Sequence, residues 1–244
     1  MQSSNPVFRT IERDQSYTIG EQATYGGIVA KTFLLFAAAI LSGFYAVTSV
    51  SAEALLPLLF VSMAVALISV IVVSWSPRLA MPFSFVYALA EGVLLGFITA
   101  LAETFAPGAA VTAIVGTGSI FLVMLFLYTS RTIRVTERFR TIMYASLLGI
   151  LVFFVFNMIL SIFGVNFFNS FYMASPAFAI GLSIFLIVFG ALMLTLDFDR
   201  AESIVEGGAD KRYEWMVAVG LMVTIIWIYI EILRLIIILT ASRR

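Results

Sequence analysis

The chain has 244 residues, of which 62% are hydrophobic and 11% are charged, and its formal net charge is zero. A soluble domain is about half apolar and about a quarter charged. With a mean hydropathy of +1.08, this composition excludes an ordinary soluble domain, and it gives no sign of a nucleic-acid-binding surface. The chain has no Cys and no His. Disulfides and a histidine pH switch are therefore excluded, and any proton chemistry must use carboxylates.

The N-terminal stretch 1–27 is polar and has none of the charged, then apolar, pattern of a signal peptide. We expect it to be a cytoplasmic tail, with the first apolar segment acting as its own insertion signal.

Seven apolar segments follow, each near the roughly 20 residues that a helix needs to cross a bilayer. They cover residues 28–50, 53–75, 81–102, 108–130, 142–164, 177–196 and 215–240. Continuous apolar runs exclude the alternating pattern of a β-barrel. The sequence therefore predicts an all-α integral membrane protein with a seven-transmembrane-helix bundle over residues 28–240 and a short tail at 241–244.

The positive charges predict the orientation, because cytoplasmic loops carry an excess of Lys and Arg. With seven spans, the N-terminal tail and the second, fourth and sixth loops share one side. That side holds ten Lys and Arg residues, and only Arg243 and Arg244 lie on the other. We expect a cytoplasmic N-terminus and an external C-terminus. The alternative is an even number of helices, which would place both ends inside.

A few charged residues fall within or at the ends of the apolar segments, where a charge costs at least about 2.5–3.5 kcal/mol at mid-bilayer. Glu91 lies in the third segment, beside the closely spaced Gly92 and Gly96. This carboxyl is either functional or a protonated group that hydrogen-bonds a neighbouring helix. The glycine spacing is typical of a helix-packing face.

The last two segments hold the other candidates. Glu231 and Arg234 share one face of the seventh segment by their i,i+3 spacing, and they form either part of a pathway or a local ion pair. Asp197 and Asp199 end the sixth segment. Their i,i+2 spacing puts them on different faces, and they either gate a pathway or simply terminate the span.

The sequence has no nucleophile–base pair, phosphate loop or metal-ligand cluster. We therefore expect neither an enzyme nor a bound cofactor.

The stretch LMLTLDFDRAESIVEGGADKRYEWMVAVGLMVTIIWIYIEILRLI, together with Asn5-Pro6-Val7-Phe8, EGVLLGFITALAE, IRVTERFR and FNMILSIFG, resembles the Bax inhibitor family, and its bacterial branch more closely. The resemblance covers nearly the whole chain. It implies a seven-helix protein of the bacterial inner (plasma) membrane that leaks Ca²⁺ in a pH-dependent way.

In that family a pair of acidic residues on the sixth and seventh helices and an arginine after the second helix control the pore. The resemblance implies that Glu231 is the seventh-helix acid, that Asp197 or Asp199 is the sixth-helix acid, and that Arg78 is the latch. However, Asp197 and Asp199 lie 34 and 32 residues before Glu231, which is farther than the family pattern.

Depth suggests a second arrangement. The third and seventh segments run in the same direction, so we expect Glu91, Glu231 and Arg234 to form a mid-membrane cluster. Asp197, Asp199 and Arg78 would then form a cytoplasmic gate. Carboxylate oxygens suit Ca²⁺, so Glu231 and Asp199 are candidates for transient Ca²⁺ contacts.

The function that we expect is a pH-sensitive Ca²⁺ leak channel, gated by protonation of buried carboxylates. Its partners would be the lipid bilayer, Ca²⁺ and protons. The alternatives are a proton-coupled transporter of another ion or small solute, and a non-transporting regulator that binds a membrane protease or another membrane protein.

Overall fold

The computed structural model describes residues 21–165, 168, 172 and 175–242. Residues 1–20 of the predicted cytoplasmic tail, with Arg9 and Arg13, lie outside the described residues, as do Arg243 and Arg244.

Seven long helices make up the described part of the chain. They are α2 (Tyr25–Ser49), α3 (Ala52–Trp75), α4 (Ala80–Phe105), α5 (Ala109–Thr129), α6 (Glu137–Ile162), α8 (Pro176–Glu206) and α9 (Tyr213–Ala241). All seven are long and apolar enough to cross a membrane. The described residues form no strand beyond one isolated β-bridge between Gln22 and Asp210. The predicted all-α, seven-helix fold is confirmed.

Two helices extend five or more residues beyond their apolar segments at one end. α6 begins at Glu137, five residues before the predicted start, and the hydroxyl of Thr136 caps it by accepting the Phe139 N–H at 3.2 Å. α8 continues to Glu206, ten residues past the predicted end. A helix satisfies its own backbone and can extend beyond the hydrocarbon, and here Asp199 and Glu202 of the extension pair with arginines.

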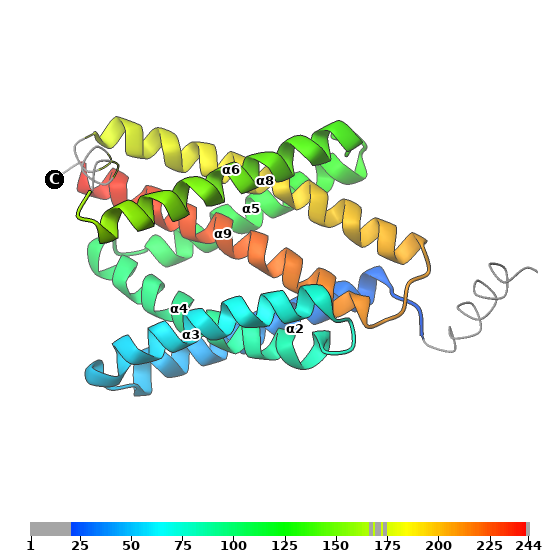
Figure 1. The fold of residues 1–244 in the computed structure, drawn as a ribbon, viewed down its shortest axis with the longest axis horizontal. Helices are drawn as coiled ribbons and strands as arrows, with labels where there is room; N and C mark the ends of the chain where they lie inside the picture. Colours follow the sequence, from blue (N-terminus) through cyan, green and yellow to red (C-terminus); the bar gives the residue numbers. More distant parts are fainter. Residues whose placement is uncertain (1–20, 166–167, 169–171, 173–174, 243–244) are drawn as a thin grey trace, which may run out of the picture.

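α9 lies between the two halves of the bundle (Figure 1). On one side are α2, α3 and α4, and on the other are α5, α6 and α8. Helices from both sides pack closely against α9, with α8, α2, α5 and α4 making the most extensive contacts. The last spanning helix is therefore the one that joins the two halves.

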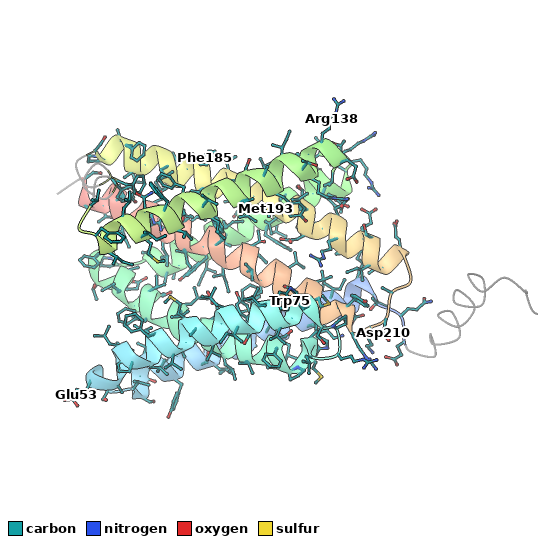
Figure 2. All side chains as sticks on the ribbon, in the orientation of Figure 1. Glu53, Trp75, Arg138, Phe185, Met193 and Asp210 are labelled. Carbon is teal, nitrogen blue, oxygen red and sulfur yellow. The ribbon has the colours of Figure 1, made fainter. Side chains whose placement is uncertain are left out.

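The bundle has two ends of different character. One end carries residues 21–24 and the links 76–79, 130–136 and 207–212, where most of the described Lys and Arg residues lie. We call this end the basic face. Glu53 and the end of α9 lie at the opposite end, as Figures 1 and 2 show. The two ends of the described chain therefore lie on opposite faces.

Large apolar side chains cover the outside of the bundle. Trp75 is 84% exposed, and Phe33 and Phe44 are each 71% exposed. Such a surface would be unstable in water, but it suits contact with lipid acyl chains. The interior contains many small residues instead, which is typical of helix packing in membranes.

α2 and α4 approach each other through glycines. A Cβ added to Gly96 would lie 2.7 Å from the carbonyl oxygen of Gly43, and one added to Gly43 would lie 2.5 Å from the carbonyl oxygen of Gly92. These neighbours are backbone atoms, so they cannot move aside as a side chain can. The Gly92 and Gly96 spacing thus forms a helix-packing face, as the sequence predicted.

Replacing Gly96 by Ala should push α2 away from α4 and destabilise the protein by about 1–3 kcal/mol, the usual cost of overpacking. Unfolding in a mixed-detergent titration measures this change. The matched control is Gly118→Ala in α5, where an added Cβ meets no atom within 4 Å. Equal stability of the two variants would contradict the described α2–α4 contact.

Candidate functional site

Ionisable side chains meet α9 at three levels. Glu214 lies at its first turn on the basic face, Asp197 of α8 reaches it at Thr224, and Glu231 and Arg234 lie farther along α9 toward the opposite face.

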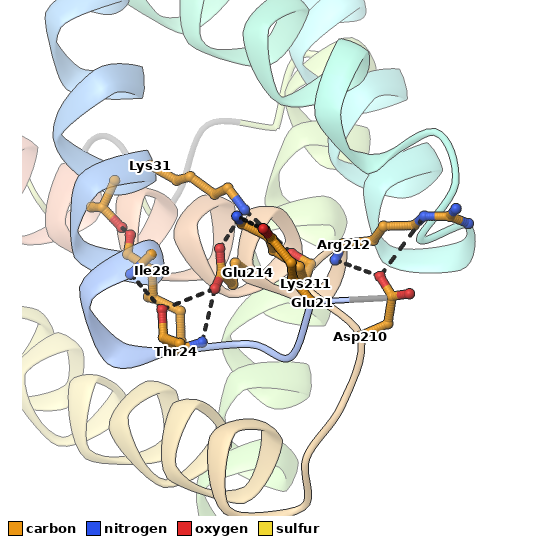
Figure 3. A network of polar contacts seen from close by, with 10 residues as sticks. Glu21, Thr24, Ile28, Lys31, Asp210, Lys211, Arg212 and Glu214 are labelled. Atoms are coloured by element: carbon orange, nitrogen blue, oxygen red, sulfur yellow. Dashed lines mark hydrogen bonds and ion pairs between the residues drawn. The ribbon is translucent and has the colours of Figure 1, made fainter. Parts of the chain in front are cut away.

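Glu214 is fully buried and joins the last spanning helix to the first (Figure 3). Its carboxylate accepts the backbone N–H of Thr24 at 2.8 Å and the Thr24 hydroxyl at 3.3 Å, and it forms an ion pair with Lys31. Thr24 is the N-cap of α2. The carboxylate thus lies at the N-terminus of α2, where the helix dipole favours a negative charge.

The residues around Glu214 leave room for this arrangement. A Cβ on Gly27 would overlap the carboxylate, so a larger residue at that position would displace the Glu214 side chain. The Lys31 ammonium lies 5.0 Å from the centre of the Trp215 ring, at a distance typical of a cation–π contact. The buried ion pair is therefore enclosed by both helices.

The chain before α2 is also bonded to the link between α8 and α9. The Ala23 N–H donates to the Ala209 carbonyl at 2.8 Å, and the Lys211 N–H donates to the Glu21 carbonyl at 2.9 Å. The side chains of Glu21 and Lys211 form an ion pair. The hydrogen bond between these two side chains lowers the pKa of Glu21 and raises the pKa of Lys211. We call residues 21–24, Lys31, 209–211 and Glu214 the terminal clamp.

Replacing Lys31 by Met should leave the Glu214 charge buried without its cation. We expect a loss of about 3–5 kcal/mol in unfolding free energy, as when one partner of a buried pair is removed. Adding Glu214→Gln should recover at least about 1 kcal/mol, because contacting residues are coupled. The control is Lys211→Met, which breaks an exposed pair and should change the unfolding midpoint little. Equal losses of unfolding free energy for the two lysine variants would show that the Lys31–Glu214 pair is not buried.

Asp197 of α8 faces α9. Its carboxylate accepts a hydrogen bond from the Thr224 hydroxyl at 2.6 Å, and a Cβ on Gly220 would lie 3.7 Å from its Oδ1 atom. The glycine lets the carboxylate come close to the α9 backbone. A half-buried acid therefore lies in the contact between the sixth and seventh spans.

Asp199, two residues later, faces α6 instead. It forms an ion pair with Arg140 at 2.7 Å, and Arg140 also pairs with Glu137 at 2.9 Å. The two aspartates thus lie on different faces of α8, as their spacing predicts. One turn farther along α8, Glu202 accepts the Tyr128 hydroxyl and pairs with Arg131 at the end of α5.

Glu231 is 6% exposed and pairs with Arg234 at 3.0 Å on the same face of α9. The predicted i,i+3 contact is therefore formed. Thr117 of α5 and Trp227 of α9 each have a buried polar atom without a hydrogen-bond partner. The spans thus keep further unpartnered polar atoms in their interior.

Hydrogen bonds between helices fix the relative depth of these groups. Thr99 of α4 bonds Tyr229 of α9 at 2.8 Å, and α4 and α9 run in the same direction. Glu91 precedes Thr99 by eight residues, so it lies at the level of residue 221 of α9. Glu231 is ten residues farther along α9, which corresponds to about 15 Å at about 1.5 Å of rise per residue. By the same measure, Asp197 lies about 10 Å from the level of Glu231, on the basic side of it.

Glu91 and Asp197 lie at nearly the same level, within about 5 Å in depth. They approach α9 from different sides. The helix of Asp197, α8, meets α9 at Thr224, and the helix of Glu91, α4, meets it at Tyr229. These two contact residues are five positions apart and so about 140° apart around α9. No hydrogen bond or ion pair joins Glu91 to a residue that the structure describes.

The expected mid-membrane cluster is not formed as predicted, since Glu91 does not meet Glu231 or Arg234. The structure also keeps Asp199 away from Glu231, because Asp199 faces α6. The reason is the register of α9: the last residues of α8 and the middle of α4 lie beside its first half. Among the described residues, no group of three or more acidic side chains could hold a metal ion.

Arg78 lies in the exposed link between α3 and α4 and forms no ion pair with a described residue. The structure does not bring it to Asp197 or Asp199. Arg140 and Arg131 are the cations that meet the acidic end of α8. In the sequence, Arg131 and Arg140 are part of a basic stretch and nothing more. The available signal was on α8, where Asp199 and Glu202 share one face by their i,i+3 spacing.

The Glu214–Lys31 pair was missed because no local pattern connects two residues 183 positions apart. The available signal was weak: both residues lie near the starts of apolar segments that begin on the same face, but Glu214 is one of four charged residues within 210–214.

Taken together, the fold and the carboxylates within it define a polytopic α-helical membrane protein with acidic groups inside its bundle. The family model described as Bax inhibitor 1 like matches residues 5–241, which is nearly the whole chain. The protein therefore belongs to the Bax inhibitor 1 like family. A comparison with curated protein sequences finds no match.

Proposed function

We propose that this protein is a pH-sensitive Ca²⁺ leak channel, in which protonation of Asp197 controls conduction between α8 and α9. The observation that carries the proposal is the hydrogen bond from the Thr224 hydroxyl to a half-buried carboxylate inside the bundle. An acid in a spanning helix is costly and usually marks an ion pathway or proton relay. The pH-dependent Ca²⁺ leak implied by the resemblance to the Bax inhibitor family supports the same function.

The position of the acids suggests how the pathway runs. Glu91 and Asp197 lie at one level on two sides of α9, and Glu231 lies about 10 Å beyond Asp197. Separate acidic positions suit conduction better than one closed cage, because an ion must bind weakly enough to leave. Carboxylate oxygens are also the ligands that Ca²⁺ prefers.

The orientation is part of the proposal. The basic face carries most of the described Lys and Arg residues, so it would lie in the cytoplasm by the positive-inside rule. The protein would then lie in a bacterial inner membrane with its C-terminus outside, and Asp197 would respond to cytoplasmic pH.

Replacing Asp197 by Asn should remove the pH dependence of Ca²⁺ flux, because the amide cannot titrate. Flux into liposomes loaded with a Ca²⁺ dye, across a pH series, measures this effect. The control is Asp210→Asn in the link between α8 and α9, which should keep the wild-type pH profile. An unchanged profile in the Asp197 variant would refute control by this residue.

Replacing Glu231 by Gln should lower Ca²⁺ flux at every pH by at least about tenfold, since about 1.4 kcal/mol in a barrier changes a rate tenfold. The reason is that Arg234 would lose its carboxylate and repel cations inside the bundle. The variant is first checked for a monodisperse elution profile in detergent. Wild-type flux through a folded Glu231 variant would place the pathway elsewhere.

The same liposomes separate the channel from a proton-coupled transporter. A leak channel conducts Ca²⁺ without a proton gradient, whereas a coupled transporter requires one. Flux that disappears when the gradient is collapsed would contradict the channel and favour the transporter.

A further inference from the structure

The end of the α5–α6 link forms an open recess of about 430 Å³ on the basic face. Tyr128, Arg131, Arg134 and Asp199 line it with polar groups, and the side chains at 133 and 135 add an apolar wall. Two of these polar groups are guanidiniums. A recess with this lining, at the end of spanning helices, lies where the headgroups of a bilayer would be.

Arg131 is held in place although its backbone is unfavourable. Its φ is 58°, in the left-handed region that favours glycine, and it is the only non-glycine residue with positive φ in the described chain. It follows the C-cap of α5, a position that glycine usually takes. An arginine in this conformation is costly, which indicates that its side chain has a use there.

Three contacts position the Arg131 guanidinium at the edge of the recess. It pairs with Glu202, it lies 5.9 Å from the centre of the Tyr128 ring, and Tyr128 itself donates to Glu202. The hydrogen bond to Glu202 raises the pKa of Arg131, so the guanidinium is charged at every physiological pH.

The residues that line the recess carry a positive excess, since two arginines face one aspartate. Glu202 is engaged by Arg131, and Asp199 is engaged by Arg140. Among the described residues, Arg134 has no carboxylate partner. One guanidinium is therefore free to meet an anion.

An apolar groove of about 310 Å³ lies farther along α8, the helix that contributes Asp199 to the recess. It is lined by residues of α6, including Gly149 and Phe153, and of α8, including Leu182 and Phe185. Figure 2 shows Phe185 on α8 and Arg138 at the basic end of α6. Of the residues of α6, Met143 alone is buried, so side chains rather than close backbone contacts hold α6 to the bundle.

The recess and the groove match the two parts of a lipid. Asp199 and Phe185 are 14 residues apart on α8, which corresponds to about 21 Å of helix. One leaflet with its headgroup region is half of a bilayer that is about 40–45 Å thick, so a lipid with its phosphate at the recess reaches a similar depth. An acyl chain that starts at the recess would therefore end at the groove.

We propose that the recess and the groove bind an anionic phospholipid, with its phosphate at Arg131 and Arg134 and an acyl chain between α6 and α8. The shared chemistry is recognition of a phosphate group by guanidiniums, which form strong charge-assisted hydrogen bonds with it. The ligand is a lipid rather than free phosphate because an apolar groove lies farther along α8 from the recess. The proposal does not depend on Ca²⁺ conduction.

The test uses the full chain in detergent with equal amounts of phosphatidylglycerol and phosphatidylcholine, and native mass spectrometry counts the lipid that stays bound. We expect wild type to retain phosphatidylglycerol over phosphatidylcholine. Arg134→Gln should reduce that preference by about tenfold, as expected for one lost charge-assisted hydrogen bond. The matched control is Arg138→Gln, which removes the same charge from an exposed position of α6 that does not line the recess.

A second pair of variants tests the groove. Gly149→Leu fills it, whereas Gly118→Leu adds the same side chain to α5, and at both positions an added Cβ meets no atom within 4 Å. We expect Gly149→Leu to lower retention of phosphatidylglycerol and Gly118→Leu to leave it unchanged. Equal retention in Arg134→Gln and Arg138→Gln would overturn the proposal.

A third arm adds inorganic phosphate as a competitor. If phosphate displaces phosphatidylglycerol and Gly149→Leu has no effect, the ligand is a free phosphate and the lipid assignment is wrong. If phosphate does not compete and Gly149→Leu lowers retention, the lipid assignment holds.

Discussion

Glu214 connects the first and last spanning helices through a carboxylate with no exposure to solvent. A charge buried in this way is stable only because the α2 N-terminus, the Thr24 hydroxyl and the Lys31 ammonium all meet it. The contact fixes the start of α9 beside the start of α2. Because α9 packs against both halves of the bundle, its register then sets the depth at which every other acidic group meets it.

That register explains the arrangement of the candidate pathway. Asp197 meets α9 at Thr224 in its first half, and Glu231 lies in its second half with its own cation, Arg234. The acids are therefore distributed along α9 instead of forming one cluster. At the end of α8, Arg140 and Arg131 neutralise Asp199 and Glu202, whereas Asp197 and Glu206 have no ion-pair partner among the described residues.

The sequence was sufficient for the seven spans, because a run of about 20 apolar residues has few other stable structures. It also predicted contacts within one helix, such as that of Glu231 with Arg234, since the helical repeat determines them. It did not predict which helices meet. The cluster of Glu91 with Glu231 assumed a similar depth for the two residues, judged from loop positions. The Thr99–Tyr229 hydrogen bond instead places Glu91 about ten residues before Glu231 along α9. Contacts between distant segments, above all that of Lys31 with Glu214, depend on packing that no local pattern encodes.

The central claim is that the Asp197–Thr224 contact couples pH to Ca²⁺ conduction. The most direct measurement is the pH profile of Ca²⁺ flux into liposomes for Thr224→Val, which keeps the carboxyl and removes only its hydroxyl donor. A hydrogen bond to a carboxylate favours its charged form. The account therefore predicts that the pH of half-maximal flux moves upward while the maximal flux is kept. A profile that coincides with that of wild type would contradict it.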